Sequence, residues 1–313
     1  MKVLIKPGKS KNILTTIAIG GEYYQSWYEN AFLNWEKYCK RHGLGLVVFD
    51  QDLISDEHKL WKKANWQKLL IAETLKNSSL SVKNICYLDT DILINYKAPN
   101  IFEDYKSDTI GLVSMVKNIP FSIEECRRKI SFLRHKYYDE KFPLDSAMFM
   151  TIDQIYLYNN LPIQDNYACT GLIMFNVDNH ANLMRSWFNK YDKNVLSLTN
   201  GGEQSHVNYE IQKWGNITWL DYKYQALWNY EMALKYPFLY SYGRNNESLI
   251  KECIEASLMT NYFLHFAGSW YESEMWKLGE VFGSKEKSRE INDYYEYLDT
   301  PVTGQSKGMI KPS

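Results

Sequence analysis

Short apolar runs separated by amphipathic stripes are the feature of this sequence that most constrains its fold. An apolar run of about four to eight residues bounded by turn residues is typical of a buried strand, whereas apolar residues three and four positions apart are typical of a helix that faces a core. Such runs occur at residues 13–19, 46–49, 85–88, 110–115, 172–177 and 217–220, and a helical stripe occupies residues 66–75. This alternation predicts a doubly wound α/β sheet, in which ligands bind at the carboxyl ends of the strands.

Two segments depart from this alternation. Residues 116–160 are rich in charged and aromatic side chains, which predicts a helical insertion. Residues 276–313 are polar, and for them we expect an amphipathic helix followed by a disordered end. The sequence therefore predicts one α/β domain over residues 1–275, interrupted by the insertion and followed by the polar tail.

Charge and cysteine content narrow the class of protein. Among 313 residues, 36 Lys and Arg stand against 37 Asp and Glu, for a formal net charge of -1. We therefore expect no nucleic-acid partner, because the chain lacks the positive field that attracts phosphate backbones. No apolar segment has the length of a signal peptide core or a transmembrane helix. The five cysteines are far apart, as is typical of reduced thiols, and we expect a cytoplasmic protein.

Carboxylates at alternate positions are the strongest candidates for chemistry. The chain has two such triplets, Asp50-Gln51-Asp52 and Asp89-Thr90-Asp91. The first leads into a polar stretch and suits a turn, whereas the second lies inside the apolar segment ICYLDTDILI. In an extended chain, residues two apart point the same way, so Asp89 and Asp91 converge. A divalent cation such as Mg²⁺ or Mn²⁺ would neutralise them, and so would a buried lysine or arginine.

The order of several segments resembles a known family. The segments ILTTIAIG, WQKLLIAETL, YLDTDILI, CTGLIMFNV, EQSHVNYEI and FLHFAG follow one another over residues 12–270. In this order they resemble the GT-A glycosyltransferases, above all the retaining group that contains glycogenin and the lipopolysaccharide galactosyltransferases, known as glycosyltransferase family 8. The resemblance implies a GT-A fold, which is a Rossmann-like, doubly wound mixed sheet.

The resemblance also implies roles for individual residues. Asp89 and Asp91 would bind a metal ion and the donor diphosphate, with His265 as the third metal ligand, and this donor set suits Mn²⁺. Glu203 and Gln204 stand at the family's Asp-Gln pair, where the acidic residue contacts donor-sugar hydroxyls and the glutamine lies near the anomeric carbon. Both also suit the start of a helix. The remaining donor-binding positions are Ile17, Ala18, Thr90, Gly171 and Gly268.

The sequence departs from the family pattern in two places. Cys169-Thr170-Gly171 stands where the family has Asn-Ala-Gly, so the asparagine is lost while the glycine remains to let the sugar or pyrophosphate approach the backbone. Gly268-Ser269-Trp270 stands where a Lys-Pro-Trp would follow the glycine, so the lysine that contacts the diphosphate is missing. Lys62, Lys63 and Lys68 are candidates for its replacement.

The resemblance implies an enzyme that transfers a hexose from a nucleotide-diphosphate sugar, above all a UDP-sugar, to a glycan or another hydroxyl acceptor with retention. Because Gln204 is a poor nucleophile, attack from the front face fits better than a double displacement. The insertion at residues 116–160 would form the acceptor side. One alternative is a sugar nucleotidyltransferase, although residues 18–22 lack the basic partner that its phosphate loop needs. Another is a non-catalytic carbohydrate- or nucleotide-binding module, which would not need the Asp89, Asp91 and His265 set.

Overall fold

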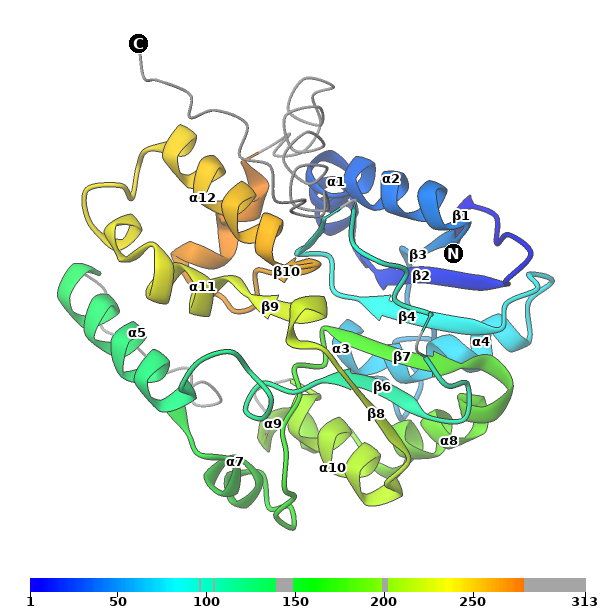
Figure 1. The fold of residues 1–313 in the computed structure, drawn as a ribbon. Helices are drawn as coiled ribbons and strands as arrows, with labels where there is room; N and C mark the ends of the chain where they lie inside the picture. The colour runs from blue at the N-terminus through cyan, green and yellow to red at the C-terminus, as the bar shows by residue number, and fades with distance from the viewer. Residues whose placement is uncertain (96, 104, 139–148, 199–201, 279–313) are drawn as a thin grey trace, which may run out of the picture.

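The computed structural model describes residues 1–278 except 96, 104, 139–148 and 199–201. In this part of the chain, seven strands form a central sheet in the order β1-β3-β2-β4-β7-β6-β8 (Figure 1). β2 is parallel to β3 and β4, whereas β7 is antiparallel to both β4 and β6. The strands are β1 (Lys2–Ile5), β2 (Asn12–Ile17), β3 (Gly45–Phe49), β4 (Asn84–Leu88), β6 (Ile110–Val113), β7 (Leu172–Asn176) and β8 (Ile217–Leu220). The predicted α/β class with a mixed sheet is confirmed.

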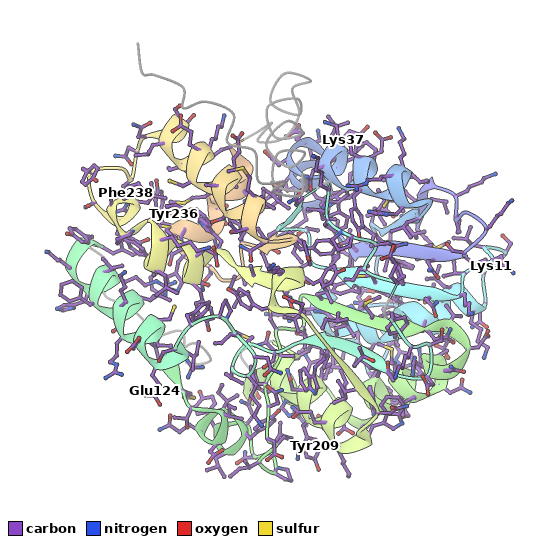
Figure 2. All side chains as sticks on the ribbon, in the orientation of Figure 1. Lys11, Lys37, Glu124, Tyr209, Tyr236 and Phe238 are labelled. Carbon is purple, nitrogen blue, oxygen red and sulfur yellow. The ribbon has the colours of Figure 1, made fainter. Side chains whose placement is uncertain are left out.

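Helices cover both faces of this sheet, and its central strands β3, β4, β6 and β7 are therefore buried over their whole length. On β2, Leu14 packs in one core cluster with Trp27 and Trp35, which lie on α1 (Gly21–Asn30) and α2 (Phe32–His42). The neighbouring Ile13 packs in a second cluster with Trp66. That second face is covered by α3 (Ala64–Gln67), η1 (Lys68–Leu70), α4 (Ile71–Lys76), α8 (Val177–Lys190) and α10 (Gln204–Trp214). Side chains fill the space between sheet and helices (Figure 2).

A smaller sheet brings distant segments to the end of the large one. Its strand order is β5-β10-β9, with β5 (Ile92–Ile94), β9 (Ala226–Leu227) and β10 (Phe263–His265). β5 follows β4 after a turn of three residues, and β10 pairs with β5 in antiparallel fashion and with β9 in parallel fashion. Around it lie η2 (Tyr222–Gln225), α11 (Trp228–Lys235), η3 (Pro237–Tyr240), α12 (Glu247–Thr260) and η4 (Tyr271–Lys277).

Two helices lie within the predicted insertion, residues 116–160, where it is described, while residues 116–122 are irregular. These helices are α5 (Ile123–Tyr137) and α7 (Ile152–Tyr158), and a further short helix, α9 (Val195–Leu198), lies later in the chain. α5 packs against α11 and lies at the edge of the molecule in Figure 1. Most of the predicted polar tail lies outside the described residues. All five cysteines are buried with free thiols, and among the described residues no helix is both long and apolar enough to cross a membrane.

Candidate active site

A tight turn between two strands presents a pair of carboxylates. Asp89 directly follows β4, and Asp91 directly precedes β5. The backbone N–H of Asp89 donates to the carbonyl of Gly171 at 2.8 Å, and the carbonyl of Asp91 accepts from the N–H of Phe266 at 3.0 Å. The turn is therefore held by the backbones of two segments that are distant in the sequence.

His265 completes the group from the second of these segments. It is the last residue of β10 and pairs with Ile92, so its ring lies beside Asp91. Its Nε2 lies 3.2 Å from Asp91 Oδ1 and 3.8 Å from Asp89 Oδ2. One potential ligand atom from each of Asp89, Asp91 and His265 lies within 4.8 Å of the other two. The structure thus brings together the three residues that the resemblance assigns to a metal.

The protonation equilibria of the two innermost groups are shifted. Burial disfavours the charged ring of His265, but Cys169 and Asp91 raise its pKa well above the usual value. Burial also opposes ionisation of Asp91, but His265 and then Lys68 hold the pKa of that carboxyl below its usual value. Asp91 Oδ1 is buried, and within the described part of the chain no group other than His265 lies close enough to donate to it. Nε2 of His265 lies 3.2 Å from this oxygen, and a carboxylate oxygen next to an imidazole nitrogen is a donor set that suits a divalent cation.

One lysine lies beneath the carboxylates. Lys68 is 1% exposed, and its Nζ lies 2.8 Å from Glu203 Oε1 and 3.6 Å from Asp89 Oδ1. Burial disfavours this ammonium, yet Asp89 and Glu203 raise its pKa. Among the described residues, Lys68 is the lysine or arginine that forms close ion pairs with this group. One ammonium thus faces three carboxylates, counting Asp91, so the group has a net negative charge of two when His265 is neutral.

Hydrogen bonds connect these charges to their neighbours. The hydroxyl of Tyr87 donates to Asp89 Oδ1 at 2.6 Å, and the hydroxyl of Thr170 donates to Glu203 Oε1 at 2.6 Å. Gln204 is the first residue of α10, and its Oε1 accepts from the backbone N–H of Thr170 at 3.3 Å. The predicted catalytic pair Glu203–Gln204 therefore adjoins the carboxylate group through a buried network.

Gly171 lies directly against the candidate metal ligands, which leave no room for a side chain at this position. A Cβ at this position would lie 2.3 Å from Cε1 of His265 and 2.8 Å from Oδ2 of Asp89. We expected this glycine to make room for the sugar or pyrophosphate. In the structure, the atoms that a side chain at Gly171 would meet first belong to His265 and Asp89, which are two of the candidate metal ligands.

The group opens onto a cleft of about 1070 Å³. The cleft is bounded by the end of β2, by α1, by the segment that leads into α3, by the turn after β4 and by η4. Of the predicted site residues, Ile17, Asp89, Thr90, Asp91 and Gly268 line it. Ala18 is buried, with its N–H donating to the carbonyl of Phe49 at 2.8 Å. His265, Gly171, Glu203 and Gln204 are not among the lining residues.

The three candidate lysines lie in three different environments. Lys63 lines the cleft, whereas Lys68 is the buried ion-pair partner described above. Lys62 is buried, and its Nζ donates to the carbonyls of Leu60, Phe188 and Tyr191 at 2.8 to 3.0 Å. Burial lowers the pKa of Lys62 to about 8. Its bonds to main-chain carbonyls tie the segment before α3 to the end of α8, which is a structural role.

Sequence reasoning missed two residues near the site. Lys277, on η4, lines the cleft and pairs with Glu274. Gln225 lies against His265, with its amide nitrogen 3.2 Å from Nδ1. Neither residue belongs to a recognisable motif. Gln225 reaches the site through the packing of the small sheet, and Lys277 reaches it through the packing of η4.

No protein-family model and no curated protein match this chain. Its structure is similar to those of several glycosyltransferases. A glycosyltransferase involved in the glycosylation of the major capsid of PBCV-1 aligns with 85% of this chain and 98% of its own, at 9% identity and a TM-score of 0.48. The galactosyltransferase LgtC, solved with donor and acceptor sugar analogues, aligns over 90% and 99%, at 11% identity and a TM-score of 0.41. GlyE of Streptococcus pneumoniae TIGR4 aligns over 96% and 67%, at 12% identity and a TM-score of 0.41. These similarities are remote, so the chemistry has to be argued from the site.

Proposed function

We propose that this chain is a metal-dependent glycosyltransferase. It transfers a hexose from a nucleotide-diphosphate sugar, with a UDP-sugar as the first candidate, to a hydroxyl group of a glycan or another acceptor. The observation that carries the proposal is the Asp89, Asp91 and His265 group, whose potential ligand atoms lie within 4.8 Å of one another beside a large cleft. We also propose a cytoplasmic location, which the five buried free thiols support.

The residues of this group fit a divalent cation. Two carboxylates and one imidazole are suitable ligands for Mn²⁺, and carboxylates alone suit Mg²⁺. Lys68 offsets one of the three negative charges of Asp89, Asp91 and Glu203, and a charge of +2 would offset the others. When bound, such an ion offsets the charge that develops on a departing diphosphate.

The residues that line the cleft are suited to bind a donor that carries phosphate groups and a flat ring system. Lys63 and Lys277 line it and can contact phosphate oxygens as point charges. Ile17 and the largely exposed ring of Tyr23 line it as well, and aromatic rings bind other flat groups by stacking. A cleft of about 1070 Å³ lies just above the range of about 300–1,000 Å³ that is usual for small-molecule sites. The donor nucleotide would therefore lie between α1 and η4, with its diphosphate near Asp91.

The environment of Glu203 and Gln204 supports retention by front-face attack. Glu203 is 4% exposed and accepts hydrogen bonds from Lys68 and Thr170, so its carboxylate is engaged and a poor nucleophile. Gln204 carries an amide, which orients a substrate without forming a stable covalent bond to it. We propose that Gln204 lies near the anomeric carbon and that residues 116–160 contribute to the acceptor side.

One experiment tests the proposal against its alternatives. The protein is incubated with UDP-, GDP- and ADP-sugars in Mn²⁺ or in EDTA, and the nucleoside diphosphate released is measured. We expect release with one donor, abolished by EDTA and by Asp91→Asn. Exchange of pyrophosphate with a sugar phosphate would instead indicate a nucleotidyltransferase, and binding without turnover would indicate a binding module. The anomeric configuration of the product, measured by NMR, tests retention.

A further inference from the structure

The two ring nitrogens of His265 face different groups. Nε2 faces the carboxylates of Asp91 and Asp89. Nδ1 lies 3.2 Å from the side-chain amide of Gln225 and 3.5 Å from the thiol of Cys169. A neutral histidine binds a metal through one nitrogen while the other nitrogen carries the proton. If Nε2 is the metal ligand, Nδ1–H therefore needs an acceptor.

Gln225 is the better acceptor of the two. It is 2% exposed, and its Oε1 is buried without a hydrogen-bond partner among the described residues. The oxygen and nitrogen of a glutamine amide exchange places by a half-turn of the last torsion, so Oε1 can take the position next to Nδ1. Cys169 Sγ is farther from Nδ1, and a thiol sulfur is a weak acceptor.

The pairing of β9 with β10 keeps the side chain of Gln225 next to the ring of His265. Gln225 is the last residue of η2 and directly precedes β9, in which Leu227 pairs with His265. On another side the ring lies against Gly171, where a Cβ would come within 2.3 Å of Cε1. The ring therefore has little freedom to turn away from the amide.

We propose that Gln225 is a positioning residue for the metal site: its side-chain oxygen accepts the proton on Nδ1 of His265 and leaves the lone pair of Nε2 to the metal. This inference rests on the proposed function, since it requires that Asp89, Asp91 and His265 bind a metal. Outer hydrogen-bond partners of metal-bound histidines contribute about 10–100-fold to metal affinity, which makes the role measurable.

The test compares Gln225→Met, which keeps the length of the side chain and removes the acceptor, with Gln225→Glu, which keeps an acceptor. Binding of Mn²⁺ alone is measured from the electron paramagnetic resonance signal of the free ion. We expect Gln225→Met to weaken Mn²⁺ binding by about 10–100-fold. Gln225→Glu should restore it to within a few-fold of wild type, and Cys169→Ala should leave it within a few-fold. Wild-type affinity in Gln225→Met, or a larger loss in Cys169→Ala, would overturn the proposal.

A second measurement needs no variant. In ¹⁵N-labelled wild-type protein saturated with Mg²⁺, two-bond ¹H–¹⁵N correlations of the imidazole should show the proton of His265 on Nδ1. A proton on Nε2 would overturn the role of Gln225. Wild-type protein that binds Mn²⁺ without transferring any sugar would contradict the proposed function, while the affinities of the variants would still decide the role of Gln225. Wild-type protein that binds no Mn²⁺ would overturn both.

Discussion

Gly171→Ala adds a single methyl group at the point where the backbone of one segment lies under two candidate metal ligands. Its Cβ would lie 2.3 Å from Cε1 of His265 and 2.8 Å from Oδ2 of Asp89. An ordinary carbon–carbon contact is about 3.5 Å, so the ring or the backbone has to move by roughly 1.2 Å. The φ angle of Gly171 is not in the left-handed region, so the variant acts through this contact and not through backbone strain.

A shift of this size is large for a metal site. Functional geometries have to be held within about 0.5 Å, so a ligand displaced by about twice that distance is lost. We expect Gly171→Ala to weaken Mn²⁺ binding by about 100-fold or more, which corresponds to about 2.7 kcal/mol. Overpacking in a filled interior should also lower the free energy of unfolding by about 1–3 kcal/mol.

The assay is the Mn²⁺ titration described above, together with urea unfolding of the metal-free protein. Gly21→Ala is a matched control, because a Cβ at Gly21 meets nothing within 4 Å and Gly21 is the first residue of α1. We expect this control to bind Mn²⁺ as wild type does. If Gly171→Ala folds with unchanged stability and binds Mn²⁺ within threefold of wild type, the reasoning about this close contact is wrong.

Three further predictions concern the fold and the cleft. Glu272→Ala leaves the buried guanidinium of Arg134 without the carboxylate that accepts from its Nε at 2.8 Å, so the free energy of unfolding in urea should fall by about 3–5 kcal/mol. Burial lowers the pKa of His206 from 6.5 to about 4, so on acidification the unfolded chain binds a proton before the folded one does. Stability should therefore fall by about 2 kcal/mol between pH 7.5 and pH 5 through this group, and His206→Phe should remove that part of the pH dependence. Lys277→Ala should raise KM for the donor roughly tenfold with a smaller change in kcat, because one cation next to the diphosphate is lost.

Each of these predictions has a control on the surface. Glu124 extends from the exposed side of α5 (Figure 2) and is 3.8 Å from Arg128, so Glu124→Ala should cost less than about 1 kcal/mol. A similar loss in both glutamate variants would contradict the argument from burial. His135→Gln, at an exposed histidine, should leave the pH dependence of wild type intact. Lys37→Ala, on the outer side of α2, should leave KM unchanged, and an equal rise in both lysine variants would show that Lys277 acts only through net charge.

Local patterns were sufficient for the central strands of the large sheet. β3, β4 and β7 are buried over their whole length. Strands that are buried on both faces have continuously apolar sequences, which can be recognised without a structure. β1, β5 and β9 were not predicted. β5 and β9 have three and two residues, and β1 has two exposed residues among its four, so none of them forms an apolar run that can be distinguished from a loop. Their existence depends on partners from distant parts of the chain.

The same distinction applies to the candidate site. Asp89 and Asp91 could be paired from the sequence because they are two positions apart in one apolar segment. The expected extended chain was wrong at this point, because the two residues lie in a turn between β4 and β5. His265 could be assigned only through the resemblance to a family, since it reaches Asp91 by the pairing of β10 with β5. Lys68 and Lys62 both lie close to α3. No pattern in the neighbouring sequence shows that Lys68 faces carboxylates whereas Lys62 faces main-chain carbonyls.

The sequence by itself determined the α/β class, the positions of the main strands along the chain and the carboxylate pair, because each depends on residues a few positions apart. Only the tertiary structure decided which cation faces Asp89, why Gly171 has no side chain, and that Gln225 and Lys277 lie at the site. These features follow from contacts between segments that are far apart in the chain. Such contacts depend on how sheets and helices pack, and packing leaves no periodic pattern in the sequence.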